Sequence, residues 1–570
     1  MRYPSIDELR VRGSQKINSL TERLAWSSQL KVPSVHSILD PKLTAKTDSD
    51  QALLDLFRSR TQPKFFQGFA EEEGAVQLFR TEWPEEALLI IKSADQLLKG
   101  SFNLLGYRGL SFGDEIDWHF EPVTRKRIPL VHWSQLDYLD ANVAGDKKIV
   151  WELNRHQYFV TLGQAYSLTG DEKYAEGFVA HIESWMDQNP PKLGINWASS
   201  LEIAFRSISW IWAIYYFRKS PIFHARTFSR ILTFLHLNAR HIERYLSTYF
   251  SPNTHLTGEA LALFYLGTLF PELKDARRWK KKGNDILLGE LSRHVRPDGV
   301  YFEQSSYYHR YTVDFYTHYL ILMQENGNVV PTIVRDALSS MTDHLMYITR
   351  PDGKTPLFGD DDGGRLVKLD LRDLNDFRST LATAAVVFQR PDYKFVAREA
   401  TEGIFWMFGT KGIETFAAIA AEEPKETSKA FPDGGYYVLR DGWSSKASYL
   451  LFDCGPHGSL NSGHSHADAL GFELVTNGQT QLVDPGTYTY TGSKEWRDWF
   501  RSSPAHNTLT LDGESSSVLA GPFSWRTKAQ GEALKWITDR RFDYIEAQHD
   551  GYRRLSHPAE HTRSILFIKK

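Results

Sequence analysis

A long series of amphipathic helices, from about residue 80 to about residue 390, constrains the fold of this chain more than any other feature. Apolar residues recur at three- and four-residue spacing in EEALLIIKSADQLL (85–98), HQYFVTLGQAYSL (156–168) and SSLEIAFRSISWIWAIYYF (199–217). This is the period of a helix with a buried stripe. Turn signals such as TGDEKY (169–174) and NPPKLG (189–194) separate the helices. About ten helices without intervening strands predict helix-on-helix packing.

Several of these helices are apolar on more than one face, as in SWIWAIYYF (209–217). A helix that is apolar all round needs neighbours on every side. The pattern therefore predicts two concentric helix layers, an (α/α) toroid, over residues 76–400. No tight sequence period is present, so a regular helical repeat is disfavoured. Residues 1–75 are expected to form a partly helical N-terminal arm.

From about residue 410 the pattern changes to short β-rich runs broken by Gly, Asn and Asp. Asn477-Gly478 lies between two apolar runs, which is a strong hairpin signal. We therefore expect an antiparallel β-sandwich over residues 401–570. Its last run reaches the end of the sequence, so a truncated sandwich is one interpretation. The β-rich runs include GIETFAAIAAEE (412–423), GGYYVLRDGW (434–443), ASYLLFDCG (447–455) and RSILFIKK (563–570).

The composition excludes several classes of protein. With 41% hydrophobic and 24% charged residues, the chain is typical of a globular protein. A net charge of -3 gives no basic excess for nucleic acid. The single cysteine, Cys454, excludes an internal disulfide framework and a cysteine-based zinc site. No apolar run is long enough to cross a bilayer, and the N-terminus shows no signal peptide. Aromatic residues, at 13%, suit either a sugar-binding cleft or a ring-rich core.

The densest polar cluster is NSGHSHADALGFEL (461–474), with His464 and His466 two residues apart. In an extended segment both imidazoles point to one face. Asp484 and His506 follow further along the chain. Two His and one Asp from separate strands form a plausible zinc set that needs no thiolate. The alternative is that these are polar residues of surface loops.

Two helical segments and one loop carry further candidates. SPNTHLTGEA (251–260) contains Asn253, His255 and Glu259, where Asn253 could also be only a helix N-cap. EQSSYYHRYTVDFY (303–316) contains Tyr308 and Tyr311, whose rings could alternatively pack inward from an amphipathic helix. The acidic FGDDDGGR (358–365) is interpreted as a hydrogen-bonded turn that shapes a cleft, because it lacks the ligand series of a calcium loop.

Polar and aromatic residues also gather at expected helix ends. The inner rim of a toroid would collect them into one aromatic, charged groove that binds substrate. These residues are Trp118, Asn154, Arg155, Asn196, Trp197, Glu202 and Arg206.

The order of the motifs resembles the heparinase II/III family of polysaccharide lyases, closest to the heparan-sulfate-lyase III type and related to alginate and oligoalginate lyases. The resemblance covers about residues 80–515. It implies an (α/α) toroid followed by an antiparallel β-sandwich. The motifs are IDWHFEP (116–122), WELNRHQYFVTLGQAYSLTGDEKYA (151–175), GINWASSLEIAFR (194–206), SPNTHLTGEALALFYLG (251–267), EQSSYYHRYTVDFY (303–316), GHSHADALGFEL (463–474), VDPGTYTY (483–490) and WFRSSPAHNTLTLDG (499–513).

The resemblance implies cleavage next to a uronic acid by β-elimination. That chemistry needs a neutralised carboxylate, a base for the C5 proton and an acid for the leaving oxygen. By resemblance, Asn253 or His255 would bind the carboxyl group, Tyr308 would be the acid and could also serve as a base, and His464 would be the other base. A structural zinc would be bound by His466, Asp484 and His506, and the residues Glu259, Tyr311, Tyr488, Tyr490 and Arg501 would line the substrate cleft.

Two other classes of function stay open at this point. One is a non-catalytic carbohydrate-binding or polysaccharide-biosynthesis accessory protein with the same fold. The other is a glycoside hydrolase with facing carboxylates, for example among Glu202, Glu259 and Glu303. The expected partner is an anionic, uronate-containing polysaccharide. The resemblance implies the cell envelope or periplasm, whereas the missing signal peptide would suit the cytoplasm.

Overall fold

The computed structural model describes residues 4–24, 32–44, 49–70 and 74–570. It divides into two compact units. The first unit comprises residues 1–289, 321–328 and 364–371, and the second comprises residues 290–320, 329–363 and 372–570. Each unit is described by itself below.

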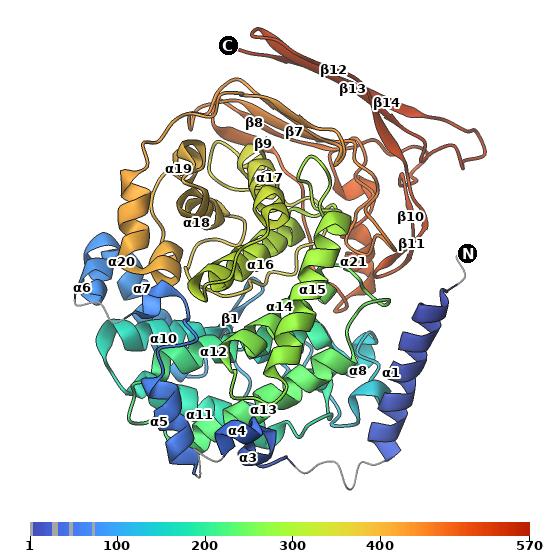
Figure 1. Cartoon of the computed structure of the whole chain (residues 1–570). Helices are drawn as coiled ribbons and strands as arrows, with labels where there is room; N and C mark the ends of the chain where they lie inside the picture. Colours follow the sequence, from blue (N-terminus) through green and yellow to red (C-terminus); the bar gives the residue numbers. More distant parts are fainter. Residues whose placement is uncertain (1–3, 25–31, 45–48, 71–73) are drawn as a thin grey trace. The chain divides into compact units, whose positions relative to one another are not determined.

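The first unit is built almost entirely from helices (Figure 1). Helix α12 (Ser200–Phe217) is buried at all 18 of its residues, as its lack of a polar face predicts. It contacts α10, α13 and α14. The other helices are α1 (Ile6–Leu24), α3 (Val35–Ile38), α4 (Pro41–Thr44), α5 (Asp50–Ser59), α6 (Ala75–Glu82), α7 (Pro84–Leu98), α8 (Ala141–Ala144), α9 (Lys147–Asn154), α10 (Tyr158–Thr169), α11 (Lys173–Gln188), α13 (Ala225–Arg244), α14 (Thr254–Leu269) and most of α15 (Ala276–His294).

Local sequence signals set the helix limits. Helix α10 ends at Gly170, whose positive φ of 70° satisfies the left-handed C-cap position. Asp171 then accepts a hydrogen bond from the Lys173 backbone N–H at 3.0 Å, in the first turn of α11. The turn expected over residues 169–174 is therefore confirmed.

Two small hairpins interrupt the helices between α7 and α8, which the helical pattern did not predict. They pair β1 (Phe102–Leu104) with β2 (Tyr107–Leu110), and β3 (Phe120–Glu121) with β4 (Lys126–Arg127). Positive φ values at Leu105 and Gly106 form the turn of the first hairpin. The strands are two to four residues long, too short to show a period in the sequence.

The second unit combines helices with the β-rich region. Helix α16 (Ser306–Glu325) begins in this unit, and α20 continues to Ala418. The first strand of the main sheet begins at Lys429, later than the expected change at residue 401. The expected strand at 412–423 is wrong over its first seven residues, because Phe416 packs inward with Gly412 on a helical face. The other helices are α17 (Thr332–Ile348), α18 (Arg378–Phe388), α19 (Pro391–Ala397), α20 (Glu402–Ala418) and α21 (Lys494–Phe500).

A five-stranded antiparallel sheet follows in the order β5-β6-β7-β8-β9. The central strands β6 and β7 are buried at every residue. Asn477 and Gly478, with φ of 50° and 73°, join β8 to β9 and confirm the expected hairpin. The strands are β5 (Lys429–Phe431), β6 (Tyr436–Arg440), β7 (Tyr449–Asp453), β8 (Phe472–Thr476) and β9 (Gln479–Leu482).

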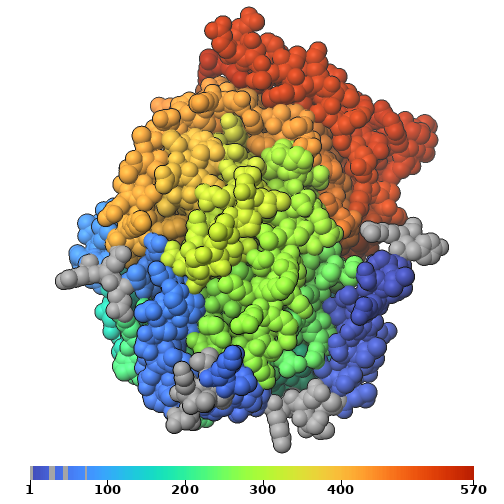
Figure 2. Space-filling model, in the orientation of Figure 1, coloured from blue at the N-terminus to red at the C-terminus, as the bar shows by residue number. Residues whose placement is uncertain are grey.

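A three-stranded antiparallel sheet packs on this main sheet (Figure 1). It consists of β12 (Gly531–Thr538), β13 (Phe542–His549) and β14 (His561–Ile568), and a separate ribbon pairs β10 (Val518–Gly521) with β11 (Ser524–Thr527). Leu450 and Phe452 of the first sheet share one apolar core with Ile545 and Ala547 of the second. Leu566 of β14 is 59% exposed, so the outer face of the smaller sheet lies at the surface. This C-terminal segment is red in Figure 2. Two facing antiparallel sheets form a sandwich.

Within the described ranges, we find no helix that combines the length and the hydropathy needed to span a membrane.

Candidate active site

Tyr308 enters the site from the first turn of α16. Its backbone N–H donates to Ser305 Oγ at 3.2 Å, and that hydroxyl donates to the Asp360 carbonyl at 2.6 Å. The start of α16 is thereby tied to the loop at residue 360. The Tyr308 ring stacks on His464, with centroids 4.1 Å apart and an interplanar angle of 28°. Tyr308 and His464, the two residues expected to transfer protons, are therefore in contact, and both belong to the second unit.

The Tyr308 hydroxyl lies 2.9 Å from the hydroxyl of Tyr490. Burial, the neighbouring Tyr490 and the charges of Asp362 and Asp360 raise the pKa of Tyr308 well above its ordinary value. Burial also raises the pKa of Tyr490. The two phenols therefore keep their protons at neutral pH, so Tyr308 can act as a proton donor.

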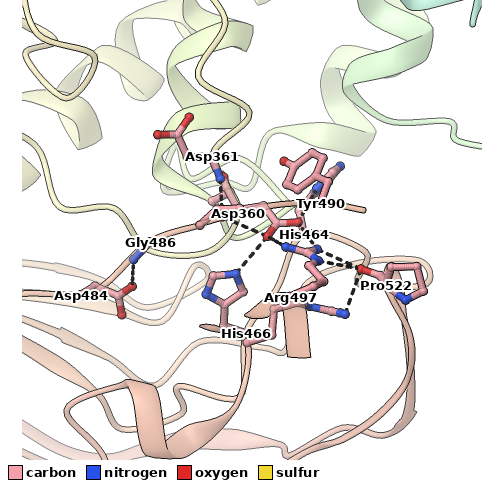
Figure 3. A network of polar contacts seen from close by, with 12 residues as sticks. Asp360, Asp361, His464, His466, Asp484, Gly486, Tyr490, Arg497 and Pro522 are labelled. Carbon is pink, nitrogen blue, oxygen red and sulfur yellow. Dashed lines mark hydrogen bonds and ion pairs between the residues drawn. The ribbon is translucent and has the colours of Figure 1, made fainter. Parts of the chain in front are cut away.

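A single buried carboxylate, Asp360, connects the histidines (Figure 3). Asp360 Oδ2 lies 3.0 Å from His464 Nδ1, and Oδ1 lies 3.0 Å from His466 Nε2. Arg497 donates to both carboxylate oxygens, at 2.5 and 2.7 Å. Burial alone would raise the pKa of Asp360, but the Arg497 charge and these hydrogen bonds hold it well below its usual range.

His466, Asp484 and His506 form a buried set that could bind a metal ion. One ligand atom from each residue lies within 4.8 Å of the other two. His506 Nδ1 is 2.8 Å from Asp484 Oδ2. Within the described ranges, His466 Nδ1 and His506 Nε2 are buried and have no hydrogen-bond partner. Two imidazoles and a carboxylate whose ligand atoms lie this close together fit a zinc ion, which accepts nitrogen and oxygen ligands without a thiolate.

Asn253 and His255 belong to the first unit. Asn253 is the N-cap of α14, because its Oδ1 accepts a hydrogen bond from the His255 backbone N–H at 3.1 Å. The capping interpretation of this motif is therefore confirmed. Asn253 is 8% exposed and His255 is partly buried, so each retains some accessible surface.

Most residues expected to line a substrate groove are instead buried inside the first unit. This group is Trp118, Asn154, Arg155, Asn196, Trp197, Glu202 and Arg206, none more than 5% exposed. Arg155 Nε donates to Glu202 at 2.6 Å, and Asn154 Nδ2 donates to the Trp118 carbonyl at 3.0 Å. The groove prediction was wrong for these side chains because they pack inside the core, where most of their polar atoms are hydrogen-bonded. Among the described residues, Asn196 Oδ1, Trp197 Nε1 and Arg206 Nε have no hydrogen-bond partner.

The contacts of Arg206 show this in detail, and two further expected substrate contacts, Glu259 and Arg501, are also corrected. Arg206 donates to the Asn196 carbonyl at 3.1 Å and lies over the Trp185 ring, and burial lowers its pKa to about 9. Glu259 is fully buried and accepts hydrogen bonds from Ser247, at 2.8 Å from N and 2.6 Å from Oγ. Arg501 is fully buried under Trp525 and donates to backbone carbonyls of residues 521 and 522.

The tyrosines of the predicted cleft differ in exposure. Tyr490 is 6% exposed and contacts Tyr308 directly. Tyr311 is 2% exposed, with its ring beside that of Tyr308. Tyr488 is 58% exposed and is therefore accessible to a ligand.

Sequence reasoning missed the roles of Asp360 and Arg497. The segment FGDDDGGR was recognised as a hydrogen-bonded turn, but its spacing does not indicate which of three acids faces inward. Arg497 lies on the seven-residue α21, where Trp496 and Trp499 are exposed. The dense charges in both segments were the only signals available in the sequence.

Comparison with known proteins defines the class of this protein. The family model described as heparinase II/III N-terminus matches residues 30–381, and the one described as heparinase II/III-like, C-terminal, matches residues 423–570. The chain belongs to the heparinase II/III family. The resemblance inferred from the motifs is thus confirmed.

Curated relatives and solved structures agree with this assignment. The chain is 25% identical over 549 residues to a heparin-sulfate lyase of Bacteroides stercoris, covering 91% of this chain and 71% of that protein. It is 28% identical over 478 residues to a heparin-sulfate lyase of Pedobacter heparinus, covering 82% of this chain and only 62% of that protein.

The fold is shared with heparinase III. One crystal structure of heparinase III matches with a TM-score of 0.69 at 22% identity, covering 93% of this chain and 77% of that chain. The heparan sulfate lyase structure from Pedobacter heparinus matches with a TM-score of 0.56 at 25% identity, covering 92% and 74%. These matches confirm the predicted fold class, a helical toroid followed by an antiparallel β-sandwich.

Proposed function

We propose that this protein is a polysaccharide lyase that cleaves a uronate-containing glycosaminoglycan of the heparan sulfate type by β-elimination. The observation that carries the proposal is the Tyr308–His464 stack, in which a protonated phenol and an imidazole lie within one cluster. Membership of the heparinase II/III family supports the reaction class. The names of the relatives, heparin-sulfate lyases, support the substrate class.

The proposed reaction moves one proton off the substrate and one proton onto it. A base takes the proton from C5 of the uronate, the bond from C4 to the leaving oxygen breaks, and a double bond forms between C4 and C5. An acid protonates the leaving oxygen, so no water is consumed. Each proton-transfer group contributes roughly 10²- to 10⁴-fold to the rate.

We assign the base to His464 and the acid to Tyr308. The raised pKa of Tyr308 supports the assignment, because the group must hold its proton until the leaving oxygen departs. Asn253 or His255 would bind the uronate carboxyl group and make the C5 proton more acidic. Tyr488 would offer an exposed ring on which the sugar can stack.

We further propose that His466, Asp484 and His506 bind a structural zinc ion. Bound zinc would supply a fixed positive charge that links three separate segments of the second unit. Removing zinc with a chelator should lower the apparent Tm by several degrees, as expected for a buried structural site. Elemental analysis that finds no metal in protein purified without chelator would contradict this assignment.

We also propose that the protein acts in the cell envelope or periplasm, where an anionic polysaccharide would be accessible. Fractionation of the producing cells with compartment markers tests this. Recovery of the protein with cytoplasmic markers only would support the alternative compartment.

The function is tested with a panel of heparan sulfate, heparin, alginate, hyaluronan and chondroitin. The reaction is followed by the ultraviolet absorbance of the unsaturated uronate. We expect absorbance to rise fastest with heparan sulfate. Binding of a polysaccharide without any absorbance change would favour a non-catalytic binding protein.

A further inference from the structure

Asp360 has no role in the proposed acid and base chemistry, yet it occupies a central position among the histidines. It lies in the loop between α17 and α18, more than 100 residues from the histidines, yet each of its carboxylate oxygens contacts a different imidazole. Its side chain is fully buried. Figure 3 shows His464 and His466 converging on this one carboxylate.

The main chain and Arg497 fix the carboxylate in place. The Asp360 backbone N–H donates to the His464 carbonyl at 2.8 Å, and Thr487 Oγ1 donates to Asp360 Oδ1 at 3.2 Å. Arg497 binds both oxygens and also donates to the Pro522 carbonyl at 2.9 Å. A carboxylate bound by both prongs of a guanidinium is ionised, so it only accepts hydrogen bonds.

This arrangement determines which nitrogen of each imidazole carries the proton. His464 must donate through Nδ1, which leaves the lone pair of its neutral ring on Nε2. His466 must donate through Nε2, which leaves its lone pair on Nδ1. His466 Nδ1 is buried and has no hydrogen-bond partner among the described residues.

The two free nitrogens suit two different tasks. His464 Nε2 lies 3.7 Å from Glu303 Oε1, beyond hydrogen-bond range, and the ring is stacked on Tyr308. That nitrogen is therefore the one available to accept a proton. His466 belongs to the set with Asp484 and His506, and because its Nε2 is bound to Asp360, Nδ1 is the nitrogen whose lone pair can bind a metal.

We propose that Asp360 is a positioning residue that sets both tautomers at once, making His464 a proton acceptor through Nε2 and His466 a metal ligand through Nδ1. The His464 part rests on the proposed lyase function, whereas the His466 part rests only on the metal set. The carboxylate thereby links the proton-transfer site to the metal site without touching the substrate.

Asp360→Asn is the direct test, because it keeps the shape but replaces one acceptor oxygen with an amide donor. With heparan sulfate we expect kcat to fall about 10²- to 10⁴-fold with KM within about threefold, as when a triad aspartate is replaced by asparagine. Zinc affinity, measured by competition with a chromophoric chelator, should fall about 10- to 100-fold. A variant with native kcat and native zinc affinity would overturn the proposal.

Asp361→Asn is the matched control. The neighbouring carboxylate points away from both imidazoles in Figure 3 and accepts a hydrogen bond from the Gly363 backbone N–H instead. We expect kcat and zinc affinity within about twofold of the native values. An equal loss in both variants would mean that the loop, rather than the Asp360 carboxylate, is responsible, and would also overturn the proposal.

A measurement on the native protein covers the case in which Asp360→Asn does not fold. With ¹⁵N-labelled histidine, the signals of His464 are identified by their loss in His464→Gln. We expect neutral His464 to carry its proton on Nδ1, and a proton on Nε2 would overturn the proposal. This result does not depend on turnover. If the native protein forms no unsaturated product, the proposed lyase function is wrong. The tautomer of His464 and the zinc affinity of Asp360→Asn still test the proposed role of Asp360 in that case.

Discussion

Two buried polar clusters, one in each unit, look alike in sequence and differ in chemistry. In the first unit, the cluster around Arg155, Glu202 and Arg206 combines charged and aromatic residues. Arg155 and Glu202 form an ion pair there, with Nε 2.6 Å from the carboxylate. In the second unit, the cluster around Asp360 and Tyr308 combines the same residue types. Among the described residues, each cluster contains a buried nitrogen without a hydrogen-bond partner, Arg206 Nε in the first and His466 Nδ1 in the second, but His466 also belongs to a set of three residues with metal-ligand atoms within 4.8 Å of one another.

The difference shows how a functional cluster can be told from a structural one. Buried polar groups that satisfy one another stabilise a core. An imidazole that belongs to a set of metal-ligand side chains, and a phenol stacked on an imidazole, instead point to a ligand or a proton-transfer role. We therefore expect variants of the first cluster to lose stability and variants of the second cluster to lose turnover.

The largest effect should come from Tyr308→Phe. The change keeps the ring and its stacking on His464 but removes the hydroxyl, so turnover of heparan sulfate should fall roughly 10²- to 10⁴-fold. The apparent Tm and KM should change little. Tyr307→Phe, one residue earlier on the same buried helix, is the control and should retain turnover. Equal turnover in native protein and Tyr308→Phe would rule out the assigned acid.

Glu202→Gln should instead destabilise the first unit. It removes the carboxylate charge that pairs with the fully buried Arg155 at 2.6 Å, although Glu152 still contacts this arginine at 3.2 Å. Breaking a buried ion pair typically costs about 3–5 kcal/mol. Urea unfolding should show this loss, while turnover per folded molecule and KM stay native. A rise in KM without loss of stability would contradict this prediction and support a substrate-binding role for Glu202.

The sequence predicted large elements well and side-chain directions poorly. Helix α12 and the Asn477-Gly478 hairpin were predictable because apolar periodicity and turn chemistry are local. The hairpins at 102–127 were missed because strands of two to four residues carry no period. Whether Arg206 faces a groove or a core depends on Trp185 and Asn196, which only the tertiary structure brings beside it.

The candidate site was likewise predicted in part from the sequence. The motif order pointed to Tyr308, His464 and the set of His466, Asp484 and His506, because these residues lie in long, specific motifs. Asp360 could not be chosen over its two acidic neighbours, since only the fold turns its carboxylate toward Arg497. Non-local contacts therefore account for what the sequence could not predict.

Glu259 should give a smaller, pH-dependent effect. Burial raises the pKa of its carboxyl to about 8, although hydrogen bonds from Ser247 lower it in part. A folded-state pKa above the unfolded value of 4.5 means that stability is lost as pH rises from about 4.5 to about 8. The glutamine in Glu259→Gln cannot ionise. The apparent Tm of this variant, relative to that of the native protein, should therefore rise as the pH increases over this range. A constant Tm difference from pH 5 to pH 8 would refute the shift.

Tyr488→Ala should give the smallest effect. The ring is 58% exposed and stacks on Phe500, so its removal should cost little stability. Loss of one stacking surface is worth about 0.5–1.5 kcal/mol, which corresponds to a KM increase of about two- to tenfold. Tyr488→Phe should retain the native KM. A large fall in kcat at unchanged KM would place Tyr488 in proton transfer instead.

The most direct test of the account is the mass of the products released from a defined heparan sulfate oligosaccharide. β-Elimination at the Tyr308–His464 pair adds no water, so the two product masses should sum to the mass of the parent chain. The new non-reducing end should carry the unsaturated uronate. Products whose masses sum to the parent plus one water would identify a hydrolase and contradict the account.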